Sequence, residues 1–300
     1  MKRLVKENKL LIISFLIVIG VLLYNIIEYN DWFKANKELI ETRIQECKSE
    51  TITEEQEICN ELLNSYHEPN PDFYYTVTVL SSDMDILIYL MFALISIPVL
   101  YYVCNLFKSR NILYLLTREN YKQMKKNILL KAYKSSLILP IIYLIIIVFS
   151  LIYCRGFNID SYYALMPTKE LFNEIINPYI YVIALIFKAL LTGLIYVNIA
   201  LIVARKNHNF YLSSLLSYIL FIAIEIFLEA LVGYIIFGKL LHIDSMMIYF
   251  NIMNIFSMNL SKGYIAVFIP LIVLFSISTI ILSLAYKNKE KLVIDCAKNN

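Results

Sequence analysis

The sequence predicts an all-α membrane protein with six transmembrane helices and a small, mainly helical external domain between the first and second spans. Three observations support this prediction. The 300-residue chain is 59% hydrophobic and only 17% charged, against roughly 45–50% and about 25% in soluble globular proteins. Its apolar residues form six runs close to the roughly 20 residues that a bilayer requires. The runs are continuous and lack the in-and-out alternation of a barrel strand.

The first run follows four basic residues, as the core of a signal peptide would. It is longer than such a core, however, and no small-residue cleavage site follows it. We therefore expect a retained membrane anchor at the start of the chain. In order, the six runs cover residues 10–27, 86–107, 137–154, 179–204, 211–237 and 264–286.

Lysine and arginine are distributed unevenly among the segments that connect the runs. Eighteen lie in residues 1–9, 108–134, 205–206 and 287–298, and eight lie in the other connections. Because basic residues concentrate in cytoplasmic connections, we expect a multi-pass protein of the cell membrane, in contact with membrane lipids, with both termini in the cytoplasm. The net charge of only +3 gives no reason to expect a nucleic-acid partner.

These assignments divide the chain into three regions. Residues 1–27 form the cytoplasmic N-terminus and first span, residues 28–85 an external acidic domain, and residues 86–300 a five-span membrane domain. The membrane domain includes an external hairpin that is apolar but too short to span, so we expect it to be re-entrant or interfacial. The basic cytoplasmic segment, this hairpin and the cytoplasmic tail cover residues 108–134, 238–263 and 287–300.

The external domain is expected to be mainly helical. Without proline or glycine after residue 28, the first span should continue outward as one long helix. A second helix should begin at Thr53, which has capping-box spacing to Gln56. Residues 73–80 are more typical of a strand. Fourteen acidic residues lie between Glu28 and Asp85, and we favour a solubilising role for them over attraction of cationic substrates.

Two of the five cysteines lie in the external domain. Cys47 and Cys59 each fall on the apolar side of an expected helix, so a disulfide that joins the two helices is the favoured interpretation. The alternative is that both are small buried apolar side chains.

The cytoplasmic segment between spans two and three contains an amphipathic, basic helix. Arg118, Lys122 and Lys125 share one face of residues 117–128, and Tyr121 shares the opposite face with two apolar residues. One interpretation is an interfacial helix whose cations contact anionic lipid headgroups. The other is a docking helix for a cytoplasmic partner.

Three ionisable residues lie inside the apolar runs: Lys188 in the fourth, and Glu225 and Glu229 in the fifth. Charge is costly in lipid, so these groups should face the protein interior and pair across adjacent helices. Two interpretations stay open: a clamp that sets helix register, and a pathway for substrate or protons.

The chain lacks the motifs of several enzyme classes. It contains no P-loop, no H-E-x-x-H and no G-x-S-x-G sequence. Its five cysteines and three histidines show no metal-ligand spacing. We therefore expect no catalytic residue and no metal site.

The arrangement of the chain resembles the permease subunits of type 2 ABC exporters, specifically the bacterial kind with an enlarged external domain after the first span. The resemblance rests on six spans with both termini inside, a basic helix between spans two and three, an apolar hairpin between spans five and six, and a basic tail, YKNKEK, that begins at Tyr286.

This resemblance implies a transport subunit, not an enzyme, with no cofactor in this chain and with ATP and Mg²⁺ on a separate cytoplasmic ABC ATPase. Residues 118–128 would be the coupling helix, and the hairpin would line an exit gate. A second permease chain, the same or different, would complete a pathway for an amphiphilic peptide, antibiotic or lipid. ATP binding would push on the coupling helices and shift spans two and five against each other. The residues expected to couple to the ATPase are Arg118, Tyr121, Lys122, Lys125 and Lys126.

Two other functions fit parts of the sequence. The chain could be a membrane-bound immunity or sensory protein that binds a peptide through its external domain. It could also be a secondary transporter in which Lys188, Glu225 and Glu229 relay protons, although it lacks the internal repeat that many such transporters have.

Overall fold

Every regular element that the structure describes is a helix. The computed structural model describes residues 2–49, 71–85, 88–108, 118, 120–158, 178–243, 250, 255–257, 260 and 264–288. The 3₁₀ turn η1 joins α6 to α7, and the π-helical stretch η2 continues α11. In chain order the elements are α1 (Lys2–Ser49), α3 (Phe73–Asp85), α4 (Ile88–Lys108), α6 (Tyr121–Tyr133), η1 (Lys134–Leu137), α7 (Ile138–Tyr153), α10 (Pro178–Lys206), α11 (Phe210–Ile226), η2 (Phe227–Leu240) and α14 (Tyr264–Ala285).

Six helical stretches are long and apolar enough to cross a membrane, which confirms the predicted fold class of an all-α, multi-pass membrane protein. Helices α4, α7, α10 and α14 begin and end within two residues of the predicted runs. The first and fifth stretches are longer than predicted, because α1 extends at both ends and α11 with η2 reaches Leu240.

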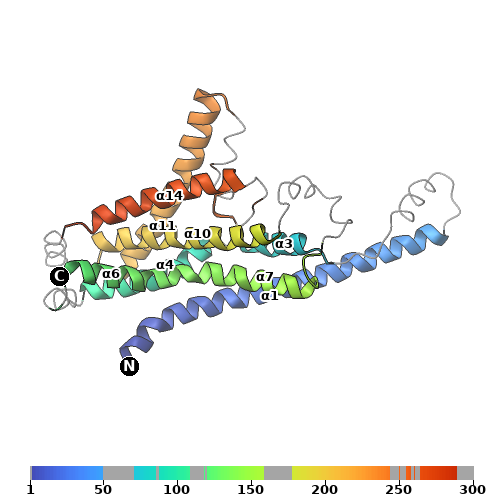
Figure 1. Cartoon of the computed structure of the whole chain (residues 1–300), viewed down its shortest axis with the longest axis horizontal. Coiled ribbons are helices and arrows are strands. Elements are labelled where there is room, and N and C mark those ends of the chain that lie inside the picture. Colours follow the sequence, from blue (N-terminus) through green and yellow to red (C-terminus); the bar gives the residue numbers. More distant parts are fainter. Residues whose placement is uncertain are drawn as a thin grey trace.

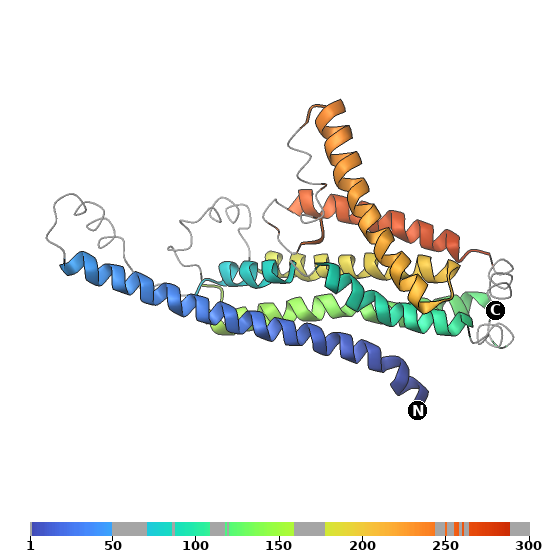
Figure 2. The ribbon, with the colours of Figure 1, turned by 180° about the vertical axis from the view of Figure 1, so that it is seen from behind.

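Helix α10 lies at the centre of the bundle. It packs against α4, α7, α11 and α14, and α1 runs along the far side of α4 and α7 (Figures 1 and 2). In both views α11 crosses the bundle obliquely and η2 continues it away from the other helices. The fifth stretch is accordingly only 17% buried in its most apolar part, against 61% for α10.

The start of α1 and the end of α14 lie at the same end of the bundle (Figure 1). The ends of α4 and α10 lie there too, and they carry Lys108, Arg205 and Lys206. This shared basic end agrees with termini on one side of the membrane. That this side is the cytoplasm stays a prediction.

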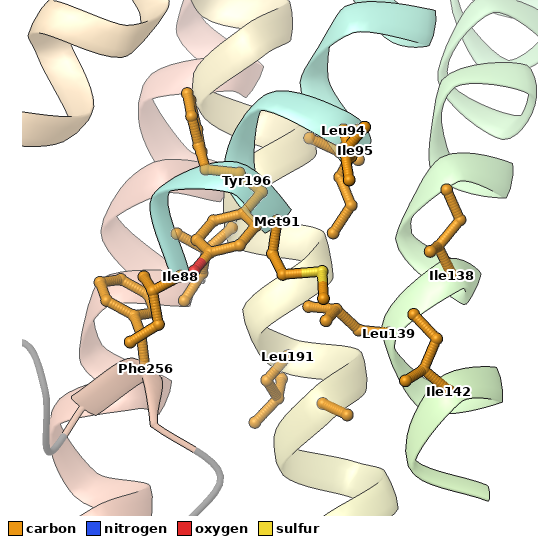
Figure 3. Close-up of a cluster of buried hydrophobic side chains, with 14 of the residues drawn as sticks. Ile88, Met91, Leu94, Ile95, Ile138, Leu139, Ile142, Leu191, Tyr196 and Phe256 are labelled. Carbon is orange, nitrogen blue, oxygen red and sulfur yellow. The ribbon is translucent and has the colours of Figure 1, made fainter. Parts of the chain in front are cut away.

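The bundle interior is filled by apolar side chains from α4, α7 and α10. In Figure 3, Met91 and Ile95 of α4 point toward Leu139 and Ile142 of α7 and toward Leu191 of α10. Because lipid tails are as apolar as these side chains, close packing holds such helices together, and the hydrophobic effect contributes little.

The closest approach of two backbones is between α10 and η1. A Cβ atom built on Gly193 would lie 2.6 Å from the carbonyl oxygen of Ser136. Only a residue without a side chain permits this contact, and small residues at helix interfaces are typical of membrane bundles. The 3₁₀ turn η1, between α6 and α7, is therefore in direct contact with the central helix α10.

The predicted continuation of the first span as one long helix is confirmed, since α1 has 48 residues and is about 72 Å long at 1.5 Å per residue. That the extension lies outside the cell stays a prediction. Near its middle, Trp32 stacks on Tyr75 of α3 with ring centroids 5.7 Å apart, and Tyr29 contacts Tyr153 of α7. Such aromatic side chains gather at membrane interfaces. The expected helix from Thr53 lies outside the described residues.

The expectation of a strand at residues 73–80 is wrong, because this segment is the helix α3. The Oδ1 atom of Asp72 accepts the backbone N–H of Tyr75 at 2.7 Å and caps the helix. Phe73, Val77 and Leu80 are all fully buried, at the i, i+4, i+7 spacing of a helix face. Packing on α1 and α7 therefore outweighs the local preference of β-branched and aromatic residues.

Candidate functional site

The basic helix predicted between spans two and three is α6. The Oδ1 atom of Asn120 caps it by accepting the backbone N–H of Lys122 at 3.5 Å. Met124 and Ile128 are buried, whereas Arg118, Lys122 and Lys126 are exposed. Lys125 and Tyr121 are half-buried. The buried apolar face agrees with the prediction, but the basic face does so only in part, because α6 begins at Tyr121, after Arg118, and Lys125 is half-buried.

The boundary between this helix and the third span differs from the prediction. Instead of a separate cytoplasmic helix, α6, η1 and α7 form one continuous helical stretch, Tyr121–Tyr153. Within the turn, the Ser136 hydroxyl donates to the carbonyl of Tyr133 at 2.7 Å. A movement of α6 would therefore pass directly into the third span.

Side-chain hydrogen bonds also join this stretch to the fourth and sixth spans. The Tyr133 hydroxyl donates to Oδ1 of Asn198 on α10 at 2.8 Å. Nδ2 of Asn198 in turn donates to the hydroxyls of Ser278 and Thr279 on α14, at 3.0 and 3.2 Å. Asn198 is 0% exposed. A buried polar network of this kind rigidifies a bundle when its groups are satisfied.

A second set of hydrogen bonds joins the start of α6 to the residue just after α14, and that residue to α10. The Tyr121 hydroxyl donates to the carbonyl of Tyr286, just after α14, at 2.7 Å. The Tyr286 hydroxyl reaches back to the carbonyl of Leu201 on α10 at 3.4 Å. Sequence reasoning missed this network, although a lone asparagine in the apolar run of α10 was a signal for it.

The three charged residues of the spans differ in burial. Lys188 of α10 is 0% exposed, Glu225 of α11 is half-buried, and Glu229 of η2 is exposed. Glu225 accepts a 2.6 Å hydrogen bond from the hydroxyl of Tyr89 on α4, a partner that sequence reasoning missed. The pairing of Lys188 with either carboxylate stays a prediction.

Aromatic rings surround the Tyr89 and Glu225 contact. Phe221 of α11 stacks on Phe92 of α4 with ring centroids 4.4 Å apart and planes 5° from parallel. Tyr89 lies edge-on to Phe221 at 6.1 Å and tilted to Tyr218 at 6.4 Å. These rings hold α11 against the first turns of α4.

Little of the predicted external hairpin, residues 238–263, falls within the described residues. Its first three residues belong to η2, which is why that helix ends later than predicted. Phe256 is buried and packs against Tyr196 and Phe221, with centroid distances of 5.5 and 5.6 Å (Figure 3). Of the rest of the hairpin, only residues 241–243, 250, 255, 257 and 260 are described, and among these Phe250 stacks on Phe237 of η2 with ring centroids 5.1 Å apart.

Near the C-terminal end of α1, Cys47 is disulfide-bonded. Its expected partner, Cys59, lies outside the described residues. Cys104 and Cys154 are free and buried in the bundle. Across the part of the chain that the structure describes, no three His, Cys, Asp or Glu side chains are grouped so that they could hold a metal ion.

Neither the known protein families, nor the curated proteins, nor the solved structures contain a match to this chain. A function therefore has to be argued from the arrangement of its own residues.

Proposed function

We propose that this chain is the transmembrane subunit of an ATP-driven exporter that moves an amphiphilic substrate, with ATP hydrolysed by a separate cytoplasmic ATPase. The observation that carries the proposal is α6: a capped, amphipathic helix with an exposed basic face at the end of the bundle where α1 begins and α14 ends. Its apolar face is already used by the bundle, so its basic face is the part available to a partner.

The contacts of α6 supply a mechanical reason for the proposal. The helix continues into α7, and through Tyr133 and Tyr121 it is hydrogen-bonded to α10 and to the end of α14. A push on α6 would therefore move α7, α10 and α14 together. The expected shift of spans two and five against each other would then be a movement of α11 and η2 relative to α4, which packs on α10.

Binding of ATP drives this helix movement only if it stabilises the arrangement of helices after the movement more than the arrangement before it. In this proposal, ATP holds two ATPase subunits together, and each pushes on the α6 of one permease chain. ATP and Mg²⁺ stay on the ATPase, and this chain supplies the coupling helix and half of the pathway. The proposed cell-membrane location with cytoplasmic termini follows from the basic end of the bundle.

The test is to isolate the tagged chain from its native membrane in mild detergent and to identify the proteins that accompany it by mass spectrometry. We expect an ABC ATPase with the unaltered chain. The triple variant Lys122→Glu, Lys125→Glu and Lys126→Glu should lose it, because the basic face is reversed.

A matched control reverses three basic residues on the outer part of α1 instead, with Lys34→Glu, Lys37→Glu and Arg43→Glu. This variant carries the same change in charge and should retain the ATPase. Failure to recover any ATPase, or equal recovery with both triple variants, would argue against the exporter.

One observation favours the second candidate, a membrane-bound immunity or sensory protein. Helix α1 continues for 16 residues beyond Phe33 to Ser49, about 24 Å past its aromatic contacts with α7. In this second proposal, the projecting helix with a disulfide near its end is the peptide-binding element. In that case the α1 triple variant would lose activity and the α6 variant would keep it.

A further inference from the structure

Helix α4, the predicted second span, begins beside the middle of the central helix α10. Phe92, in the second turn of α4, lies edge-on to Tyr196 of α10 with ring centroids 5.2 Å apart, and Figure 3 shows Ile88 close to the same tyrosine. Tyr196 is 18 residues from the start of α10 at Pro178, about 27 Å at 1.5 Å per residue. Helix α4 therefore does not reach the far end of the bundle, opposite the basic end.

Helix α3 lies beside this far part of α10 and α7. Tyr74 is edge-on to Tyr181, three residues after Pro178, with ring centroids 5.3 Å apart. The Thr76 hydroxyl lies 3.4 Å from the sulfur of Cys154, just after α7. Figures 1 and 2 show α3 and α4 following one another along the bundle. Helix α3 therefore runs from the far end toward the start of α4, and its 13 residues are about 20 Å long.

Two contacts measure how far α3 and α4 reach together. Thr76 meets Cys154 at the far end, and the Lys131 ammonium group lies over the ring of Tyr102, 5.4 Å from its centroid, toward the basic end. Along α3 and α4, 26 residues separate Thr76 from Tyr102, and along α6, η1 and α7, 23 separate Lys131 from Cys154. These paths are about 39 and 35 Å long, and a hydrocarbon core is roughly 30 Å thick. Helices α3 and α4 together are therefore long enough to cross the membrane beside α7.

Lys188 and the last turn of α3 lie at the same depth. Helices α3 and α10 run in the same direction, and a side-chain hydrogen bond joins Thr78 of α3 to Tyr181 of α10. Seven residues further along each helix are Asp85 and Lys188. Residues seven apart share a helix face, and equal steps along parallel helices give equal depths. The register therefore places positions 85 and 188 opposite each other, about 10 Å farther into the bundle.

We propose that α3 and α4 together form the second span, and that the carboxylate of Asp85 pairs with the ammonium group of Lys188 inside the bilayer. Lys188 is 0% exposed, and an ion at such a depth is costly unless it is paired. Residues 73–85 then belong to the membrane domain and not to the external domain. The pair clamps α3 to the central helix, whether the chain exports a substrate or binds a peptide.

The competing arrangement pairs Lys188 with Glu225 or Glu229 of the fifth span, as the sequence predicts. Two observations favour Asp85. Glu225 accepts its hydrogen bond from Tyr89 of α4, which lies farther toward the basic end than Asp85. Glu229 is exposed, whereas Lys188 is fully buried. A buried ammonium group is better matched by a carboxylate on a helix that packs within the bundle.

Chemical crosslinking identifies the partner of Lys188 without altering the chain. Dicyclohexylcarbodiimide enters membranes and activates a carboxylate there, and an adjacent amine then displaces the urea and leaves an amide bond. The full chain is treated in its native membrane, and the linked peptides are identified by mass spectrometry. We expect an amide between Asp85 and Lys188. A link from Lys188 to Glu225 or Glu229 instead would overturn the proposed pair.

The same chemistry tests the depth of α3. Asp31 of α1 is exposed and serves as the control. In open membrane fragments, we expect a water-soluble carbodiimide that does not enter membranes to modify Asp31 but not Asp85, and dicyclohexylcarbodiimide to modify Asp85. If the water-soluble reagent modifies both carboxylates at the same rate, α3 lies outside the membrane and the two-part span is wrong.

A charge exchange decides the question if no crosslink forms. Lys188→Asp and Asp85→Lys should each abolish the monodisperse peak in detergent, because each places like charges together. The double variant should restore the peak, and rescue of this kind requires a folded chain. Lys188→Asp combined with Glu225→Lys, or with Glu229→Lys, has the same net charge and should not restore it. Rescue by either glutamate variant, or no rescue with Asp85→Lys, would overturn the inference.

Discussion

The contact between Gly193 and η1 provides a quantitative test of the packing that seats the third span on the central helix. A methyl group in Gly193→Ala would lie 2.6 Å from the carbonyl oxygen of Ser136, and 3.1 and 3.2 Å from its Cα and carbonyl carbon. Ordinary contacts of this kind begin near 3.4 Å, so the two backbones must separate by about 0.8 Å.

The expected cost follows from these distances. Overpacking costs about 1–3 kcal/mol, and we expect about 3 here because all three nearest atoms are backbone and cannot rotate away. Alanine regains roughly 1 kcal/mol of helix preference over glycine. The net loss is therefore about 2 kcal/mol, which corresponds to a fall of about 4–8 °C in the thermal midpoint.

Gly20→Ala is the matched control. It is the same substitution within the apolar part of α1, where an added Cβ meets nothing within 4 Å. We expect a neutral effect or a gain of up to roughly 1 kcal/mol. The assay is the fraction of monodisperse protein that remains in detergent after heating, measured by fluorescence-detected size-exclusion chromatography. Equal midpoints for the two variants would refute the close approach of α10 and η1.

The remaining predictions concern the polar contacts. The variants Tyr133→Phe and Asn198→Leu should be coupled by about 0.6–1.7 kcal/mol in a double-mutant cycle; additive effects on the thermal midpoint would contradict a direct hydrogen bond. Asp72→Ala should cost about 1 kcal/mol by removing the cap of α3, whereas Asp72→Asn, which can still accept the Tyr75 N–H, should retain most of the stability in the same assay. Cys47→Ser should abolish the reduction-dependent shift in gel mobility that Cys104→Ser leaves intact; an identical shift in both variants would show that Cys47 is not bonded.

The six spans were predictable because the bilayer restricts the choice of structure. A long apolar segment in lipid must satisfy its backbone hydrogen bonds internally and therefore becomes a helix. This is why the predicted sixth run, residues 264–286, corresponds to α14, Tyr264–Ala285. The amphipathic pattern of α6 could also be recognised in the sequence, because one face of the helix packs on the bundle and the other is exposed.

The wrong prediction of a strand at α3 shows that local sequence preference alone does not decide between helix and strand. Residues 73–80 are rich in residues that favour strands, yet Phe73, Val77 and Leu80 also have helical spacing. The choice between these patterns was made by α1 and α7, against which this face is buried. Sequence reasoning gave more weight to local preference than to the spacing, and the tertiary contacts decided otherwise.

The residues of the candidate site also differ in whether the sequence alone singles them out. Lys188, Glu225 and Glu229 could be singled out because charge in an apolar run is rare and costly. Asn198 is less conspicuous, and its importance depends on Tyr133, Ser278 and Thr279, which come from other helices. No local pattern indicates that these side chains meet.

By itself, the sequence determined that this is a helical, multi-pass membrane protein and where its apolar runs lie, because the transfer of apolar residues into lipid depends on composition. The lengths of the first, third and fifth helical stretches differ from the predicted runs. Only the tertiary structure decided that α6 continues into α7, that Asn198 joins α10 to α14, and that η2 leaves the bundle with Glu229 exposed. These features depend on which faces of different helices meet, and contacts between residues distant in the chain set the positions of those faces.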